Sequence, residues 1–218
     1  MGAPRGEEPG IRPCGPEQEA MVREQIEARG VCDPRVLAAM RAVPRLRFVP
    51  GALAGEAHAD RPLPIGAGQT ISQPYIVAAM AEALELTGSE RVLEVGAGSG
   101  YMAAVLAALS REVYAMELEP GLLARAAATL AGLGCGNVHL RCGDGALGWP
   151  EEAPFNAILL SCAAPRIPPD LWDQLAADGR IILPMGPPGA TQELILARRT
   201  AAGSRVSRLM AVCFVPLR

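Results

Sequence analysis

Apolar residues near the N-terminus recur at helical spacing and are bounded by residues that start or stop helices. Residues 17–29 carry apolar side chains every three or four positions, and Gly30 follows as a suitable stop. Asp33 before Pro34 predicts a second helix start, because aspartate caps helix N-termini and proline fits the first turn. A third helix is expected over residues 75–86. The N-terminal part is therefore expected to be helical.

From Arg91 onward, short apolar runs alternate with stretches rich in alanine and leucine. This alternation predicts an α/β fold with a doubly wound, mostly parallel sheet and helices on both faces, similar to a Rossmann fold. Residues 192–200 and 204–217 are expected to close it as an antiparallel pair, after extra N-terminal helices. The expected strands span residues 91–96, 111–119, 137–145, 155–164 and 180–186, and the helices 99–110, 120–134 and 168–179.

Composition changes along the chain suggest its domain organisation. Residues 1–16 are half glycine and proline, which predicts a disordered tail. Half of all 218 residues are hydrophobic, enough for one sizeable core. We expect a single domain over residues 17–218. Its first part, residues 17–88, holds the N-terminal helices and a loop, and residues 89–218 form a ligand-binding sheet.

The loop is the segment PLPIGAGQTISQP, residues 62–74. It has no charged residue, and its three prolines and two glycines predict neither a helix nor a regular strand. Its polar side chains are short and end in amides or hydroxyls. A stiff, neutral segment of this kind is suited to lie over a bound ligand without adding a competing charge.

A glycine-rich turn follows the first buried strand of the sheet. Gly96, Gly98 and Gly100 lie where strand becomes helix, and open α/β sheets bind ligands at such carboxyl ends. Glycines let the backbone approach a ligand closely. Glu117 ends the next strand, about twenty residues on, where a carboxylate can accept hydrogen bonds from ribose hydroxyls. A solvated acid at a strand end is the simpler alternative, but glycines and acid together favour a nucleoside.

The spacing of the glycines narrows the choice of nucleoside. A dinucleotide fingerprint needs a small residue where this chain has Tyr101, and no basic residue lies in the loop. Both features favour S-adenosylmethionine over NAD. Glu94 is then placed to meet the cationic methionyl end, or alternatively to cap neighbouring backbone. Asp144, after the following strand, suits an adenine amino group, although an Asp-Gly turn explains it equally well.

Charge and cysteine content argue against a nucleic-acid-binding protein, a membrane protein and a zinc protein. The net charge of −3 gives no basic field for nucleic acid, and no apolar run has the length of a membrane span. Six cysteines without a C-x-x-C pair, and only two histidines, argue against a zinc site, so no metal is expected. No secretory signal precedes the cysteines, so we expect reduced thiols in a cytoplasmic protein.

Two segments make the chain resemble the protein-L-isoaspartate O-methyltransferase family: RGVCDPRVLAAMRAVPRLRFVP and DRPLPIGAGQTISQPYIVAAM, followed by VLEVGAGSGY and, near the end, FVPL. The resemblance covers residues 21–217. It implies S-adenosylmethionine-dependent methylation of L-isoaspartyl residues in damaged proteins, with S-adenosylhomocysteine as product. It implies a catalytic Ser72 and a substrate loop of Gln69, Thr70 and Ile71. The cofactor residues that it implies are Gly96, Gly98, Gly100, Glu117 and Asp144, and we expect Glu94, Ser99 and Gly143 to bind the cofactor with them.

The chain departs from the family pattern at a few positions, among them His58, where a tyrosine is usual. Because the acceptor carboxylate is already ionised near neutral pH, no general base is needed, and we expect His58 and His139 to be structural or exposed. We expect a monomer that binds damaged proteins. Alternatives are a methyltransferase for another carboxylate or a small molecule, a non-catalytic nucleotide-binding module and, more remotely, an NAD-dependent reductase.

Overall fold

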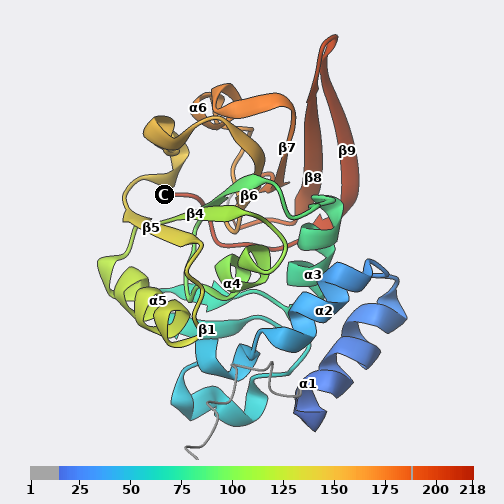
Figure 1. Cartoon of the computed structure of the whole chain (residues 1–218), viewed down its shortest axis with the longest axis vertical. Helices are drawn as coiled ribbons and strands as arrows, with labels where there is room; N and C mark the ends of the chain where they lie inside the picture. The colour runs from blue at the N-terminus through green and yellow to red at the C-terminus, as the bar shows by residue number, and fades with distance from the viewer. Residues whose placement is uncertain (1–14, 188) are drawn as a thin grey trace, which may run out of the picture.

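A seven-stranded sheet forms the centre of the computed structural model, which describes residues 15–187 and 189–218 (Figure 1). Its strand order is β5-β4-β3-β6-β7-β8-β9. The strands from β5 to β7 pair in parallel, and β8 and β9 add antiparallel pairs at one edge. The strands are β3 (Arg91–Val95), β4 (Glu112–Glu117), β5 (Val138–Cys142), β6 (Phe155–Leu160), β7 (Leu175–Met185), β8 (Gln192–Thr200) and β9 (Gly203–Val212). The predicted α/β fold is confirmed.

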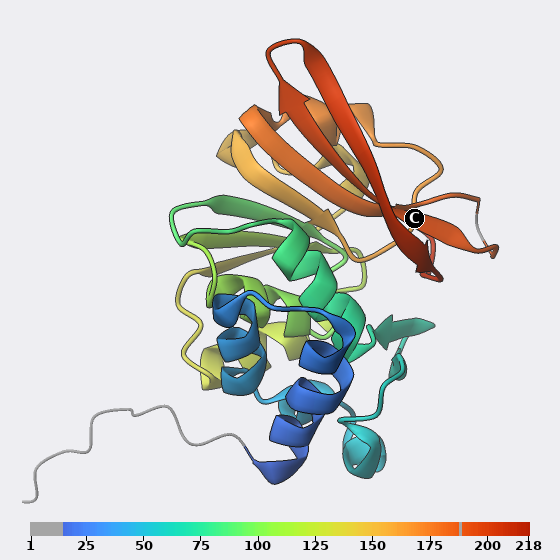
Figure 2. The same cartoon turned by 90° about the vertical axis from the view of Figure 1, so that its right-hand side faces the viewer.

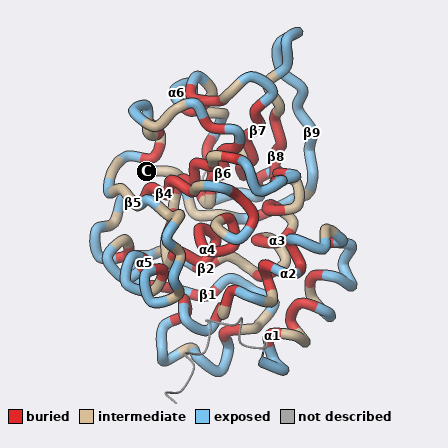
Figure 3. Tube along the Cα trace, in the orientation of Figure 1, coloured by how far each residue is buried: buried red, intermediate tan, exposed pale blue. Residues whose placement is uncertain are grey.

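Both faces of this sheet are covered because successive strand residues point to opposite faces. Val92 packs into the core on one side, whereas its neighbours Leu93 and Val95 belong to a second cluster on the other side. The first cluster includes residues of the helices α3 (Pro74–Ala83), α4 (Tyr101–Ala107) and α5 (Pro120–Gly132). The second includes α6 (Pro169–Asp173). Figure 3 shows burial concentrated in the central strands and α4.

The N-terminal segment is helical, as predicted, but its winding changes along its length. It consists of α1 (Pro16–Ala20), a π-helical turn η1 (Met21–Ile26) and a 3-10 turn η2 (Glu27–Arg29). Gly30 ends it with a φ of 97°. The predicted tail, residues 1–16, lies outside the described residues except for its last two positions. In Figure 2 these helices lie on the same side of the sheet as α3.

The second helix begins where the Asp33-Pro34 pair predicts it. α2 (Pro34–Ala42) starts with the Asp33 side chain accepting a hydrogen bond from the Arg35 amide. Two 3-10 turns then lead toward the neutral segment, η3 (Arg45–Phe48) and η4 (Gly51–Glu56), and two more, η5 (Gly145–Leu147) and η6 (Pro150–Glu152), follow β5. No helix among the described residues combines the length and apolar character needed to cross a membrane.

The prediction that residues 62–74 form no regular strand was wrong. They contain a two-stranded antiparallel hairpin of β1 (Leu63–Gly66) and β2 (Gln69–Ile71). The breakers fit because Pro64 is exposed in a strand with one partner, where a missing amide donor is tolerated. Gly66, Ala67 and Gly68 all have positive φ and make the turn.

The helix predicted over residues 168–179 was also wrong in its second half. α6 ends at Asp173, and β7 begins two residues later with the buried Leu175 pairing with Phe155. Asp178 has a φ of 59°, and the register of the pairing shifts before Arg180. Burial of Leu175 in the sheet therefore overrides the local helical pattern, as tertiary contacts commonly do.

Candidate active site

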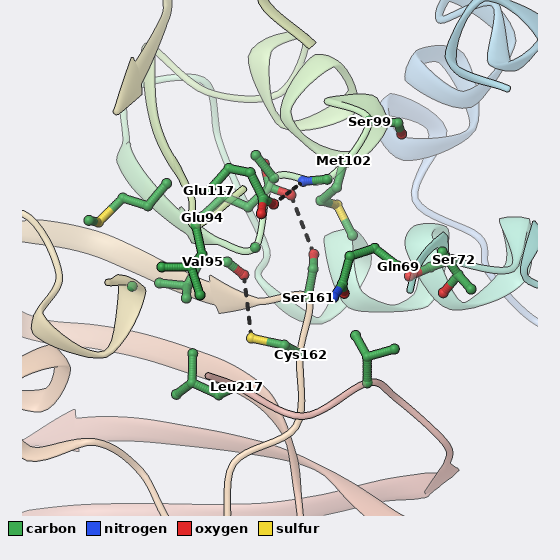
Figure 4. Close-up of a pocket in the computed structure, with 18 of the residues that line it drawn as sticks. Gln69, Ser72, Glu94, Val95, Ser99, Met102, Glu117, Ser161, Cys162 and Leu217 are labelled. Atoms are coloured by element: carbon green, nitrogen blue, oxygen red, sulfur yellow. Dashed lines mark hydrogen bonds between the residues drawn. The ribbon is translucent and has the colours of Figure 1, made fainter. Parts of the chain in front are cut away.

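A pocket opens at the carboxyl ends of β3 and β4, on the edge where the sequence places its glycine loop (Figure 4). It encloses about 760 Å³ of space, part of it open to solvent. Its walls come from the hairpin, the glycine loop, the residues after β6 and the C-terminal segment. Figure 4 shows the side chains of Glu94 and Glu117 on one side and those of Gln69 and Ser72 on the other, with Ser161 between them.

The glycines are required by the backbone of the loop. Gly96, Gly98 and Gly100 have φ values of 87°, 55° and 85°, which side chains rarely adopt. A β-carbon on Gly98 would lie 3.3 Å from the Ile65 side chain of the hairpin. Gly96 and Gly98 line the pocket, as does Ser99. Gly100 instead precedes α4, where a β-carbon would lie 3.2 Å from Ala126, so it serves helix packing outside the pocket lining.

Tyr101, the residue that argued against a dinucleotide, is wholly buried at the start of α4. It is 1% exposed, and its ring meets that of Phe48 edge-on with centroids 5.4 Å apart. The tyrosine therefore packs α4 against the turn η3. A small residue at this position would leave the space beside Phe48 unfilled.

Glu117 is buried at the end of β4 and holds the glycine loop. One carboxylate oxygen accepts a hydrogen bond from the Gly98 amide at 2.8 Å, and the other from the Glu119 amide at 2.9 Å. Each oxygen retains lone-pair capacity for a further donor. Since Glu117 also lines the pocket, its carboxylate is anchored in place for hydroxyl groups of a ligand.

Glu94 has no exposed surface and an incomplete set of partners. Its Oε1 accepts a hydrogen bond from the Ser161 hydroxyl at 3.3 Å, whereas Oε2 is buried with no partner among the described residues. Burial, with repulsion from Glu117, raises the pKa of Glu94 to about 8. A buried carboxyl group with an orphaned oxygen fits a ligand that brings a positive charge, such as the methionyl end of S-adenosylmethionine.

The pKa of Glu94 predicts that binding of this cation releases a proton. At pH 7 the carboxyl group is mostly protonated, and a positive ligand lowers its pKa, so affinity should rise with pH toward about 8. Calorimetry at pH 7 in two buffers of different ionisation enthalpy counts the protons released. We expect the Glu94→Gln variant to release fewer protons when it binds the ligand, because glutamine has no titrating proton. Glu94→Gln is a matched control for this calorimetry because the ligand's own amino group titrates in both proteins.

The raised pKa of Glu94 also predicts how the stability of the ligand-free protein changes with pH. The folded state holds the Glu94 proton more tightly than the unfolded state, so the fold loses stability as pH rises from the ordinary value of 4.5 to about 8. Glu94→Gln should therefore raise the melting temperature of the ligand-free protein more at pH 9 than at pH 5. An equal change at both would contradict the assignment.

Asp144 and Gly143 were predicted together but are placed differently. Gly143 lines the pocket, whereas Asp144 is exposed and outside its lining. Its Oδ1 accepts a hydrogen bond from the Ala146 amide at 2.8 Å, which caps the turn η5. Gly145 must be glycine, since a β-carbon would lie 2.3 Å from Val95. The turn η5 gives one carboxylate oxygen of Asp144 a hydrogen-bond partner. Contact between Asp144 and adenine stays a prediction.

The hairpin and the residue after it form another wall, through Gln69, Thr70, Ile71 and Ser72, all of which line the pocket. A serine just before a helix commonly caps it, which would give Ser72 a structural role instead of a catalytic one. The residue at the N-cap position of α3 is Gln73, and its side chain makes no capping hydrogen bond. The Gln73 amide instead donates to the Asp60 carboxylate at 2.8 Å. The capping interpretation of Ser72 is therefore not supported.

Sequence reasoning missed the segment after β6. Ser161 and Cys162 both line the pocket because β6 pairs directly with β3. Burial and the two nearby carboxylates raise the pKa of the Cys162 thiol to about 12, so it is not a thiolate nucleophile near neutral pH. The five cysteines in the described part of the chain are free, and no cluster suited to a metal ion occurs there.

The two histidines lie outside the pocket lining, as expected of structural residues. His58 is half-buried with its Nδ1 3.6 Å from Glu17, and burial lowers its pKa. His139 stacks on the Tyr114 ring with centroids 4.8 Å apart. Neither lines the pocket at the carboxyl ends of β3 and β4.

The mostly parallel sheet, the uncharged glycine loop and the buried acids on two neighbouring strands define a class I methyltransferase with a Rossmann-like fold. Comparison with known proteins gives the family. Residues 16–218 match the family described as protein-L-isoaspartate(D-aspartate) O-methyltransferase. The chain belongs to this family.

The similarity to individual relatives extends over nearly the whole chain. Protein-L-isoaspartate O-methyltransferase 2 of Anaeromyxobacter sp. (strain Fw109-5) is 60% identical over 202 residues, covering 93% of this chain and 83% of the relative. A Plasmodium falciparum structure is described as a putative protein-L-isoaspartate O-methyltransferase in complex with S-adenosyl-L-homocysteine. It is 26% identical to this chain with a TM-score of 0.77, and the match covers 92% of this chain and 98% of that one. Another solved protein-L-isoaspartate O-methyltransferase is 25% identical with a TM-score of 0.81, covering 91% of this chain and 65% of that one.

Proposed function

We propose that this chain transfers a methyl group from S-adenosyl-L-methionine to the free carboxylate of L-isoaspartyl residues in damaged proteins. S-adenosyl-L-homocysteine is the other product. Family membership over residues 16–218 supports this activity. The related Plasmodium falciparum protein in complex with S-adenosyl-L-homocysteine supports the cofactor.

One observation about the pocket carries the choice of acceptor. Among the described residues that line it, none is histidine or lysine, and the thiol of Cys162 is held protonated. The two glutamates of the lining are assigned to the cofactor in this proposal, Glu117 to its ribose and Glu94 to its cationic end, so neither is left to act as a base on the acceptor. Hydroxyl and amine acceptors commonly need a base to become nucleophilic, whereas a carboxylate is ionised already near neutral pH. The pocket therefore suits a carboxylate acceptor.

The chain's own residues bind, orient and exclude water. When bound, S-adenosylmethionine supplies an electrophilic methyl group on a positively charged sulfur, and its transfer to a carboxylate removes both charges. Walls that exclude water favour such a loss of charge, and the hairpin adds Ile71 without adding any charge. Ser72 donates a hydrogen bond to the acceptor carboxylate and fixes its orientation. Correct alignment alone is worth roughly 7–11 kcal/mol of barrier.

Methylation begins repair because it converts a poor leaving group into a good one. The backbone nitrogen that follows the isoaspartyl residue attacks the new ester, methanol leaves, and a succinimide forms. Hydrolysis of the succinimide returns part of the material as normal aspartate. None of these later steps needs a residue of the enzyme.

Methyl transfer to an L-isoaspartyl peptide tests the proposal. We expect S-adenosylhomocysteine to form in step with a base-labile ester, followed by methanol. Cofactor binding without any S-adenosylhomocysteine would indicate a non-catalytic nucleotide-binding module. Transfer to other carboxylates or small molecules, with none to the peptide, would indicate a methyltransferase of different specificity.

Ser72→Ala should lower kcat/KM for the isoaspartyl peptide by roughly 10- to 100-fold, the cost of a lost hydrogen bond to a charged partner in the transition state. Cofactor affinity, measured by calorimetry, should change little, because the glycine loop and the two buried glutamates remain. Steady-state kinetics with the isoaspartyl peptide measures the effect.

Melting temperature separates this role from a structural one. Loss of a helix cap would lower the melting temperature of the Ser72→Ala variant and leave turnover nearly normal. Because Ser72 does not cap α3 in the structure, we expect the reverse: nearly unchanged melting temperature with slow turnover. Normal kinetics would show that Ser72 has no catalytic role.

We further propose a cytoplasmic monomer that binds no nucleic acid. The net charge of −3 supports the last point, and the cysteine content supports a reducing compartment. Ultracentrifugation tests the oligomeric state independently of activity.

A further inference from the structure

A second pocket adjoins the candidate active site on the far side of Ser72. It encloses about 880 Å³, part of it open to solvent, between the hairpin, the start of α3 and the end of β9. Thr70 and Ser72 line both pockets, so the two meet at these side chains. The glycine loop and the two buried glutamates line only the first.

The arrangement divides the ligands between the pockets. A cofactor held by the glycine loop fills the first pocket, and the acceptor carboxylate has to meet it beside Ser72. The remainder of the substrate cannot lie where the cofactor lies. It therefore extends into the second pocket, which is joined to the first at Ser72.

The second pocket has a distinct chemistry. None of its lining residues in the described part of the chain carries a charge. Its apolar surface comes from both walls, and the polar groups beside it are short hydroxyls, a thiol and the Gln73 amide. A charged side chain placed there would lose water without gaining an ionic partner, which is costly. The apolar lining residues are Pro62, Ile76, Ala211, Val212 and Phe214.

We propose that this second pocket receives the side chain next to the isoaspartyl residue and selects apolar side chains over charged ones. The inference rests on the proposed function and adds a sequence preference to it. Ile76 of α3 and Phe214, which follows β9, are half-buried and give the pocket its specificity for an aliphatic or aromatic group.

Peptides of one sequence with Leu, Glu or Lys immediately before or immediately after the isoaspartyl residue test the preference. At one of these positions we expect kcat/KM to be roughly 10-fold higher for Leu than for either charged residue. A loss with Glu alone would indicate long-range repulsion from the site's carboxylates and would overturn the proposal. Equal rates at both positions would also overturn it, whereas no methylation of any peptide would remove the proposed function itself.

Two variants on β9 supply an independent test. Ala211 is exposed and lines the pocket, so Ala211→Glu adds a carboxylate at its wall without filling a core position. We expect the ratio of kcat/KM for the Lys peptide to that for the Leu peptide to rise at least about 10-fold. Val206, 54% exposed on the same strand and outside the pocket, gives the matched control Val206→Glu, which should leave the ratio unchanged.

Cofactor affinity and melting temperature should be similar in both variants and the unmodified protein, since neither position contacts the glycine loop pocket. An unchanged peptide ratio in a folded Ala211→Glu protein would overturn the assignment of the second pocket. An equal change in Val206→Glu would do the same, because it would show a general effect of surface charge.

Discussion

An L-isoaspartyl peptide is expected to be methylated at least about 100 times faster than its L-aspartyl twin. In the isoaspartyl residue the backbone runs through the β-carbon, so the free carboxylate lies one methylene closer to the backbone than in an aspartyl side chain. A carboxylate misplaced by about 1 Å loses on the order of 100-fold in rate when alignment supplies the catalysis. The two peptides have equal mass and charge, so alignment alone distinguishes them.

The structure explains why the site can enforce this alignment. Ser72 directly follows a hairpin whose paired residues Leu63 and Ile71 are 0% and 3% exposed. The Arg125 guanidinium donates a hydrogen bond to the Ile65 carbonyl at 2.7 Å and fixes the same hairpin from α5. A wall anchored at both strands cannot move easily to accept a carboxylate in another position.

The measurement compares kcat/KM for the two peptides at one cofactor concentration. S-adenosylhomocysteine formation reports methylation of either peptide, and an isoaspartyl peptide with an amidated α-carboxyl group is the control for other acceptors. Equal rates on the twins would contradict the role of the hairpin and leave only a carboxyl methyltransferase of broad specificity.

Much of the fold follows from local patterns because its central elements carry their signals locally. The strand RVLEV has a buried apolar residue on each face, and the Asp33-Pro34 pair starts a helix by its own chemistry. Two elements depended on distant contacts instead. Leu175 belongs to a strand only because β6 lies beside it, and the hairpin at residues 63–71 depends on burial of Leu63 and Ile71 against the rest of the chain.

The residues of the candidate site also divide into those predictable from local sequence and those that depend on contacts between distant elements. Gly96 and Gly98 are predictable since a strand, a glycine turn and a helix follow one another in the sequence. Ser161 lines the site because β6 pairs with β3, which is a fact of sheet order. The available signal was its position after a buried strand, since parallel strands place their carboxyl ends at one edge. Gly100 stays a prediction as a ligand-binding residue, and its positive φ and its approach to α5 already favour glycine there.

Glu117→Ala is expected to weaken S-adenosylmethionine binding by about 1.5–3 kcal/mol, a factor of about 10 to 150. The carboxylate has two roles that the variant removes together. It is proposed to accept hydrogen bonds from the ribose hydroxyls, and it already holds the Gly98 and Glu119 amides. Calorimetry with S-adenosylmethionine measures the total, and Glu112→Ala, at the other end of β4 and outside the pocket, is the matched control.

A ligand that lacks the ribose hydroxyls separates the two roles of Glu117. The unmodified protein should bind dideoxy-S-adenosylhomocysteine more weakly than the parent compound, because a buried carboxylate then loses its ligand donors. If Glu117 contacts the ribose, Glu117→Ala should bind the two compounds with nearly equal affinity, since the partner of the hydroxyls is already gone. If Glu117 only supports the glycine loop, the penalty for removing the hydroxyls persists in the variant. That result would assign the ribose contact to another residue and leave Glu117 as a backbone anchor for Gly98.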